Sequence, residues 1–464
     1  MRNLIFFLIL FPFIAFGQTY SIKTTIHNST DTVAYLGHHF ATQRYLDDTA
    51  KVINGKALFE GTKELTPGIY FYYTPNNYFE FLIEEQKFSL EATAPDFVQS
   101  MKIKNSSLNE GFYKLQRFTA DMKTKSKPIL DQYDSTSTEA QKKEIKAQMD
   151  VLNKQVVAFQ NELKEEYKGT LLAKLILLMQ SPEVPDIPEG TEDPDLYKYT
   201  YYKNHFWDGI DITDPGILRS PLLDAKINDY LDNVVVQLSD SVIKEVDILL
   251  DEAKPSKETF RYLLITLVNK YERSPIIDFD KVFVHIVEKY YLTGMADDWT
   301  TGETLDKLKS RIAMIKPNFI GNPAPELVLW DTLGTEVNIR DIDAQYTVLY
   351  FYDPDCGHCK KKTPELYSHY ADLIAKGVEI VGVCTSTDEK KWKDFIQKDG
   401  LEWINLADLN SQTYFRYYYD IRSTPTVYIL DKDKKIVVKK IDALDIPGVI
   451  DQLIKQDSLK AENP

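Results

Sequence analysis

The sequence predicts a multidomain protein with a small N-terminal β-sandwich, a central all-α region and a C-terminal α/β domain with a central mixed sheet. The prediction rests on the length and on two changes in the spacing of apolar residues. The chain has 464 residues, which at about 150 residues per domain favours three domains. Apolar residues recur with period two at first, with helical spacing next, and in alternating strands and helices at the end. The predicted domains are residues 18–95, 96–316 and 317–464.

Composition describes an ordinary globular chain, with 43% hydrophobic and 27% charged residues. The formal net charge of −15 repels phosphate backbones, so we expect no nucleic-acid partner. Only 3 residues are cysteine, which excludes a scaffold held together by disulfides. These cysteines therefore need another explanation.

The first seventeen residues have the pattern of an export signal. Arg2 precedes an apolar run from Leu4 to Phe16, and the chain then has a small-x-small cleavage pattern that ends at Gly17. We expect cleavage after Gly17 and export to the periplasm or cell envelope. The run is shorter than the ~20 residues that span a bilayer, so an uncleaved anchor is the less favoured alternative. No later segment has about 18 consecutive apolar residues, so we expect no membrane span in the mature chain.

Residues 18–95 alternate apolar and polar side chains, as strands with one buried face do. Asn54-Gly55 lies between two such runs and predicts a two-residue hairpin turn, because both turn positions need positive φ. We expect about seven short antiparallel strands that form a β-sandwich. The period-two positions are Tyr20, Ile22, Thr24, Ile26, Ala57, Phe59, Ile69, Phe71, Tyr73, Phe79, Phe81 and Ile83.

Residues 96–316 have helical spacing. One apolar stripe, which Pro128 is expected to end, is followed by a second, and together they predict two long helices folded back on one another. A homodimer formed through this region is the alternative use of the stripes. The stripes comprise Leu108, Phe112, Leu115 and Met122, then Ile145, Met149, Leu152, Val156, Phe159 and Leu163.

A loop rich in proline and acidic residues, 182–194, leads to further helices with an aromatic cluster. Such clusters form a core or a domain contact more often than a ligand site, although exposed aromatic side chains favour binding. The sequence assigns no chemistry to this region. The cluster comprises Tyr197, Tyr199, Tyr201, Tyr202, Phe206 and Trp207.

From residue 317 the pattern alternates between strand and helix, after a stiff junction at 322–325. This alternation predicts an α/β fold with a central mixed sheet. Strands are expected at Leu327–Leu329, Thr347–Tyr352, Val378–Val383, Thr426–Leu430 and Ile436–Val438. Helices are expected around Leu366–Ile374, Trp392–Ile396, Ser411–Tyr419 and Ile450–Ile454.

The motif Cys356-Gly357-His358-Cys359 lies between a predicted strand and a predicted helix. A spacing of three puts both sulfurs on one side of the first helical turn, close enough to form a disulfide or to remain a dithiol. Unpaired N–H groups and the dipole at a helix start favour a negative charge, so we expect a lowered pKa for Cys356. Cys359 should be the less exposed thiol.

Charged neighbours of the motif act in both directions. His358 and the three lysines at 360–362 favour a thiolate at Cys356. Asp353 and Asp355 oppose it. The sequence does not decide which set prevails.

Residues from about 320 to 460 resemble a thioredoxin domain of the TlpA type. The matching features are the strand that leads into the CGHC motif, Pro364 in the following helix, and Thr424-Pro425 before the strand at 426–430. The resemblance implies that Thr424-Pro425 is the family's cis-proline loop, which faces the disulfide and pairs with substrate backbone. It also implies that Cys356 is the nucleophile and Cys359 the resolving thiol, with Gly357 and His358 as supporting residues. The residues before the helical region resemble the small β-domain that precedes thioredoxin domains in some Gram-negative envelope proteins.

Two departures from the family affect proton transfer. Tyr350 stands where thioredoxin has a buried acid, and Lys362 stands where TlpA-type relatives often have a glutamate. The proton of Cys359 must therefore leave through another group, for which Glu365 or water is the expectation. Asp355 replaces the tryptophan that is common before the first cysteine.

Other uses of the cysteines and histidines are less favoured. Zinc needs four ligands, and Cys384 is the only other thiol, so we expect no metal site. A permanent disulfide across two residues constrains little chain entropy. Cys384 is expected to be a small buried hydrophobe, with a regulatory role as the alternative, and His38-His39 is expected on a strand or loop surface. A peroxidase would need threonine where Asp353 stands.

The sequence thus predicts an exported thiol-disulfide oxidoreductase that exchanges disulfides with envelope proteins and uses no cofactor. Its expected partners are protein thiol or disulfide substrates and an upstream redox partner. The alternative is an envelope binding or assembly protein that uses a weakly active thioredoxin fold for docking. This alternative is favoured by the absence of an acidic residue at two positions, where this chain has Tyr350 and Lys362.

Overall fold

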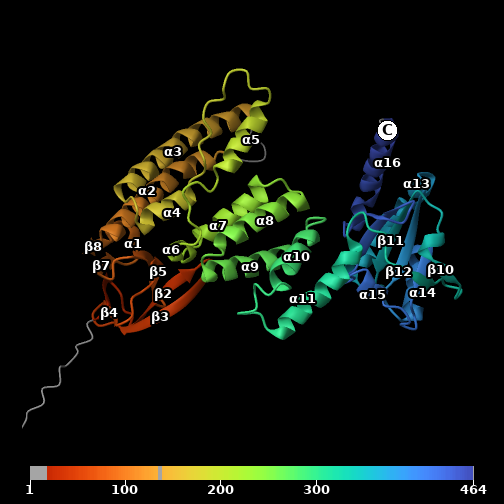
Figure 1. Cartoon of the computed structure of the whole chain (residues 1–464), viewed down its shortest axis with the longest axis horizontal. Helices are drawn as coiled ribbons and strands as arrows, with labels where there is room; N and C mark the ends of the chain where they lie inside the picture. Colours follow the sequence, from red (N-terminus) through yellow and green to blue (C-terminus); the bar gives the residue numbers. More distant parts are fainter. Residues whose placement is uncertain (1–17, 134–137, 463–464) are drawn as a thin grey trace, which may run out of the picture. The chain divides into compact units, whose positions relative to one another are not determined.

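The computed structural model describes residues 18–133 and 138–462, and the predicted export signal lies outside them (Figure 1). The chain divides into two compact units. The first contains the residues up to Val236 together with Ile248–Phe260. The second contains Gln237–Asp247 and the residues from Arg261 onward. No helix within the described residues is both long and apolar enough to cross a bilayer.

The first unit begins with two four-stranded sheets, which confirm the predicted β-rich domain. Their facing sides are joined by aromatic contacts, such as Phe59 with Tyr72 and Phe81 with Phe88, whose ring centroids lie 6.3 and 5.8 Å apart. One sheet has the order β4 (Lys56–Gly61), β1 (Tyr20–His27), β7 (Lys87–Thr93) and β8 (Lys102–Lys104). The other has the order β3 (Gln43–Lys51), β2 (Val33–Phe40), β5 (Gly68–Tyr73) and β6 (Tyr78–Ile83).

Two expectations for this domain need correction. The strands are not all antiparallel, because β1 and β7, which are far apart in the sequence, pair in parallel. Asn54 and Gly55 do form a tight turn, with φ of 52° and 72° and a bridge between Ile53 and Lys56. The turn does not close a hairpin within one sheet, however, because β3 and β4 belong to different sheets.

The predicted long helices are α2 (Ser107–Leu130) and α3 (Glu139–Glu166), and they pack on one another. The rings of Phe118 and Phe159 stack with centroids 3.9 Å apart, and Lys114 Nζ lies 2.9 Å from Glu166 Oε2. Pro128 does not end α2 as expected, because it lies in the last turn, where it removes only one backbone hydrogen bond.

The other helices of this region are shorter. Phe206 and Trp207 of the aromatic cluster contact the ring of Tyr230, with centroids 5.0 and 5.5 Å away, whereas Tyr199 is exposed. The cluster is therefore partly core. The helices are α1 (Phe97–Ser100), α4 (Leu171–Met179), α5 (Pro194–Asn204), α6 (Pro215–Leu218), α7 (Leu222–Asp229), α8 (Ser239–Ala253), α9 (Lys257–Glu272), α10 (Asp280–Ile286) and α11 (Gly302–Ile315). Residues of α8 and α9 occur in both units, and α10 and α11 belong to the second.

The C-terminal domain has a mixed sheet, as predicted, and the sheet has seven strands rather than the five expected. The sheet order is β10 (Glu336–Asn338), β9 (Val328–Trp330), β13 (Ile404–Ala407), β12 (Val378–Cys384), β11 (Tyr346–Tyr352), β14 (Thr426–Asp431) and β15 (Ile436–Lys439). Its helices are α12 (Gly357–Ser368), α13 (Tyr370–Ala375), α14 (Glu389–Asp399), α15 (Phe415–Tyr418) and α16 (Ile446–Glu462). β11 pairs in parallel with β12 and antiparallel with β14.

Three local expectations for this domain differ from the structure. The helix expected around Leu366–Ile374 is two helices that meet at His369. The helix expected from Ser411 shrinks to α15, because the Asp408 carboxylate accepts the backbone N–H groups of Gln412 and Thr413 and holds them in a turn. The short strands β10 and β13 were not expected.

Candidate active site

Cys356 lies between β11 and α12, in the position that immediately precedes the helix. Its backbone is extended, with φ of −70° and ψ of 123°, and its carbonyl accepts the N–H of Lys360 at 3.0 Å. Its own N–H donates to the carbonyl of Asp353 at 3.0 Å. The thiol therefore stands beside the unpaired N–H groups of the first helical turn.

The Thr424–Pro425 peptide lies against the same thiol and is cis, as the family resemblance implies. Cys356 Sγ donates to the carbonyl oxygen of Thr424 at 3.1 Å. Sheet pairing explains this contact, because Phe351 near the end of β11 is paired with Thr426 at the start of β14. The two segments, 68 residues apart in sequence, meet at one edge of the sheet.

The pKa of Cys356 is lowered, in the direction that the sequence predicts. Partial burial acts against this shift by raising the pKa. Hydrogen bonds to the thiolate, first among them the one from the backbone N–H of Cys359, outweigh it. The lowered pKa increases the share of thiolate at the more accessible sulfur, and the thiolate is the form that attacks disulfides.

Cys359 is the opposite kind of thiol. It has no exposed surface, and burial raises its pKa to about 12, with the neighbouring Cys356 thiol adding to the shift. All three cysteines of the chain are free thiols in the structure. The pair therefore combines an ionisable, partly exposed sulfur with a protonated, buried one.

Of the two acidic residues that oppose the Cys356 thiolate, Asp355 is paired with a cation. Asp355 Oδ2 lies 2.6 Å from Nζ of Lys391 on α14, which lowers the pKa of Asp355. Lys362 pairs with Asp442 and is directed to that carboxylate. His358 is exposed at the helix start. The sequence did not reveal Lys391 or Asp442, because each is far from the motif in the chain and has no motif of its own.

Tyr350, at the position of the missing acid, belongs to the buried cluster that contains Cys359 and bonds a second hydroxyl group. Tyr350 Oη lies 2.9 Å from Thr363 Oγ1, and both residues have no exposed surface. Burial raises the pKa of Tyr350, so it is a neutral phenol. Glu365, the expected proton acceptor, is an exposed residue, and none of the described hydrogen bonds joins it to Cys359. The expectation for Glu365 is therefore not supported by the geometry.

The remaining candidates have structural surroundings. Cys384 is buried, and burial raises its pKa to about 12. His38 and His39 lie on β2, where they bond Asp47 and Glu80 at 2.7 and 2.9 Å, and His39 is buried rather than at the surface. Within residues 18–133 and 138–462, no group of three or more His, Cys, Asp or Glu side chains is arranged to hold a metal ion.

Three family models match consecutive stretches of the chain. The AhpC/TSA family matches residues 320–439, and two domains of unknown function, DUF5106 and DUF4369, match residues 137–318 and 20–112. Residues 320–439 are thus a thioredoxin-like domain of the AhpC/TSA family, preceded by two domains without an assigned function. The predicted multidomain fold is confirmed.

Relatives of the C-terminal domain are thiol-disulfide oxidoreductases. The thiol-disulfide oxidoreductase ResA of Bacillus cereus is 29% identical over 122 residues, which are 26% of this chain and 69% of the relative. The Bacillus subtilis ResA is 28% identical over 117 residues, 25% of this chain and 64% of the relative. The chain thus spans about two thirds of the length of these relatives, and they support the same class of activity for this domain.

The chain is also similar to solved structures. A domain of a possible thiol-disulfide isomerase from Cytophaga hutchinsonii is 35% identical, with a TM-score of 0.29. The match covers 31% of this chain and 97% of the solved chain. A thioredoxin-like protein from Bacteroides caccae is 21% identical, with a TM-score of 0.47. The match covers 58% of this chain and 98% of the solved chain.

Proposed function

We propose that this chain is an exported thiol-disulfide oxidoreductase that exchanges disulfides with proteins of the cell envelope through Cys356 and Cys359. The observation that carries the proposal is the asymmetry of the two thiols. Cys356 has a lowered pKa and lies 3.1 Å from the carbonyl of Thr424, whereas Cys359 is buried with a raised pKa. The export signal before Gln18 supports the envelope location.

The electrons of the reaction move only between the two thiols and the substrate disulfide. The Cys356 thiolate attacks one sulfur of a substrate disulfide, forms a mixed disulfide, and displaces the other substrate sulfur as a thiolate. Cys359 then attacks the Cys356 sulfur, which releases the first substrate sulfur, and the proton of Cys359 passes through water to a substrate thiolate. The substrate gains two electrons and becomes a dithiol, and the protein becomes the Cys356–Cys359 disulfide. The reverse sequence oxidises a substrate.

The histidine within the motif bears on the direction of electron flow. A positive charge or donor beside the Cys356 thiolate stabilises the reduced form, which raises the reduction potential. We therefore infer a potential nearer to the ~−180 mV of protein disulfide isomerase than to the ~−270 mV of thioredoxin. Equilibration of the full chain with glutathione redox buffers measures this value.

The test of the proposed function is disulfide exchange by the purified full chain. We expect it to reduce insulin or to refold scrambled ribonuclease, and Cys356→Ser should abolish the activity because the remaining thiols are buried. Cys359→Ser should trap mixed disulfides with envelope proteins, because the resolving thiol is gone. An insulin reduction rate that is unchanged in Cys356→Ser would refute the assignment.

The alternative is a binding or assembly protein whose thioredoxin fold serves for docking. The observation that favours it is Tyr350, a neutral phenol where an acid would accept the proton of Cys359. Alkylation of Cys356 at different pH values separates the two functions. A midpoint well below about 8.5 supports catalysis, and an ordinary value supports docking. A homodimer through the helical region is a separate proposal, which light scattering of the purified chain tests.

A further inference from the structure

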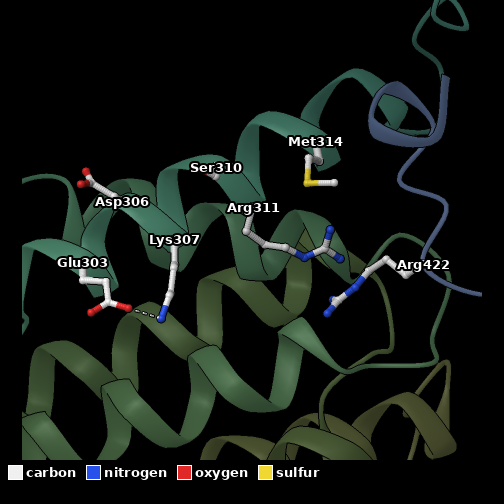
Figure 2. A pocket seen from close by; sticks show the side chains of 7 residues that line it. All are labelled: Glu303, Asp306, Lys307, Ser310, Arg311, Met314 and Arg422. Carbon is white, nitrogen blue, oxygen red and sulfur yellow. Dashed lines mark hydrogen bonds and ion pairs between the residues drawn. The ribbon is translucent and has the colours of Figure 1, made fainter. Parts of the chain in front are cut away.

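A shallow groove of about 680 Å³ lies beside the cis-proline loop in the second compact unit (Figure 2). One wall is the side of α11 that carries Lys307, Arg311 and Met314. The other is Arg422, which belongs to the loop that leads to Thr424. The groove therefore joins a helix of the central region to the loop that contacts the candidate nucleophile.

Arg422 lies close along the chain to Thr424, the residue that contacts the reacting sulfur. It precedes Thr424 by two residues, and the carbonyl of Thr424 lies 3.1 Å from Cys356 Sγ. Two residues of extended backbone span at most about 7 Å. A protein segment held on Cys356 by a mixed disulfide thus has Arg422 within reach of its nearest side chains.

The loop is fixed in this position by ion pairs at its base. The carboxylate of Asp420 is 1% exposed, and it lies 2.5 Å from Nη1 of Arg311 and 2.5 Å from Nζ of Lys440. The side-chain amide of Asn318, just after α11, donates to the carbonyl of Tyr418 at 2.6 Å. Arg422 therefore projects from a loop whose base is anchored to the helical segment.

The cations at this end of the groove outnumber the anions. In the ion pairs of the described residues, Arg311, Arg422 and the neighbouring Lys440 contact two carboxylates, those of Asp420 and Glu272. A single Glu272 oxygen serves both arginines, at 3.5 Å from Nε of Arg311 and 3.7 Å from Nη1 of Arg422. Figure 2 shows both guanidinium groups directed to the same part of the groove.

Among these cations, Arg422 has the guanidinium group most accessible to a further anion. Its side chain is 63% exposed, and its described ion pair is long, whereas Lys307 at the other end of the groove is engaged by Glu303 at 2.6 Å. A guanidinium group can bind a carboxylate through two parallel hydrogen bonds. The exposed N–H groups of the Arg422 guanidinium are therefore suited to bind a second carboxylate, in addition to that of Glu272.

We propose that Arg422 is a specificity-determining residue that binds an acidic side chain located near the cysteine of a protein substrate. This inference rests on the proposed function, because it places the substrate cysteine on Cys356. The preference for an acidic segment must come from groups close to Arg422, because the chain as a whole has a net charge of −15. At physiological salt the Debye length is about 8 Å, so charges farther away contribute little. The occupant is a substrate segment with Asp or Glu within a few residues of its reacting cysteine.

The test uses two peptides that differ only in the residues flanking one cysteine, which are aspartate in one and lysine in the other. Each cysteine carries thionitrobenzoate as a mixed disulfide. In the full chain with Cys359→Ser, the Cys356 thiolate attacks the peptide sulfur, the bond to thionitrobenzoate breaks, and the coloured thiolate is released. The product is a Cys356–peptide disulfide, which mass spectrometry identifies. The ratio of the two second-order rate constants cancels changes common to both peptides.

Arg422→Glu is compared with Lys432→Glu, which makes the same change of charge. Lys432 is exposed in the turn after β14, at the opposite end of this strand from the cis-proline loop. Six strand residues place it about 20 Å away, beyond the range of unscreened interaction. We expect the acidic peptide to react about threefold faster in the parent chain and in Lys432→Glu, and about threefold slower in Arg422→Glu.

High salt should bring the ratio towards one, because the Debye length falls to about 3 Å at 1 M. Equal rates for both peptides in the parent chain, or a ratio unchanged by Arg422→Glu, would overturn the inference while leaving the proposed function intact. An equal shift in Lys432→Glu would also overturn it, because the effect would then be one of overall charge. Failure of both peptides to form an adduct with Cys356 would instead refute the proposed function.

Discussion

Strand β11 separates two buried layers, and the layers differ in what their polar atoms do. Tyr350 faces the layer that contains Cys359 and Cys384, whereas Leu349 faces the other layer. In the second layer, Tyr428 donates to the carbonyl of Tyr419 at 2.7 Å, so its hydroxyl holds a loop in place. In the first, the hydroxyl of Tyr350 bonds another side chain, Thr363, in the same layer as the thiols. One face of the strand thus serves stability and the other surrounds the chemistry.

Among the substitutions that test this difference between the two faces, we expect Leu349→Ala to cause the largest loss of stability. Leu349 is fully buried in the layer without cysteines. Removing its methyl groups leaves a cavity, so unfolding in urea should show a loss of about 3 kcal/mol. The pH dependence of Cys356 alkylation should not change, because the substitution lies on the other face.

The matched control is Leu333→Ala, since Leu333 is a leucine of the same domain that is 88% exposed. Its stability should change by less than about 0.5 kcal/mol. A shift of the Cys356 alkylation midpoint in Leu349→Ala would contradict the separation of the two faces.

A smaller loss of stability is expected from Tyr350→Phe. The substitution removes one hydroxyl without opening a cavity, and it leaves the buried Thr363 hydroxyl without this partner. The expected loss is about 1–2 kcal/mol, measured by urea unfolding of the reduced protein. In the double variant with Thr363→Val both polar groups are gone, so the loss should be smaller than the sum of the single losses. Additive losses would show that the two hydroxyl groups do not interact.

The sequence was most informative where the chemistry is local. The spacing of Cys356 and Cys359 at a helix start was sufficient to predict one accessible and one buried thiol, because both properties follow from the first turn of α12. Five of the seven strands of the mixed sheet were predicted from their apolar runs, whereas the short strands β10 and β13 were not. The contact of Thr424 with Cys356 was expected only through the family resemblance, since a sheet pairing joins segments 68 residues apart.

Features that depend on distant polar partners were not predictable. Asp408 shortens α15 through hydrogen bonds to backbone N–H groups, which the apolar pattern of the segment does not reveal. The pairing of Asp420 with Arg311 joins residues 109 positions apart, and neither belongs to a recognisable motif. The limits of the three domains stay predictions, because the compact units and the family models divide the chain in different ways.

The smallest expected effect is on the alkylation of Cys356 when Lys391 is replaced. Lys391 is exposed and pairs with Asp355, which is next to Cys356 in the chain. In Lys391→Gln the Asp355 carboxylate loses its partner beside Cys356. An unpaired negative charge disfavours the thiolate, so the pKa of Cys356 should rise and its alkylation midpoint should move to higher pH. Both groups are exposed, so the alkylation rate below the midpoint should fall by less than about twofold.

Lys390→Gln is the matched control, because it removes the neighbouring lysine of α14, which pairs with Asp394 instead. The two variants have the same net charge, so a difference between them reports the position of the charge. The shift in Lys391→Gln should vanish at 1 M salt, where the Debye length is about 3 Å. Equal midpoints for the two variants at low salt would mean that Asp355 does not affect Cys356. The thiolate would then depend only on the N–H groups of the helix start.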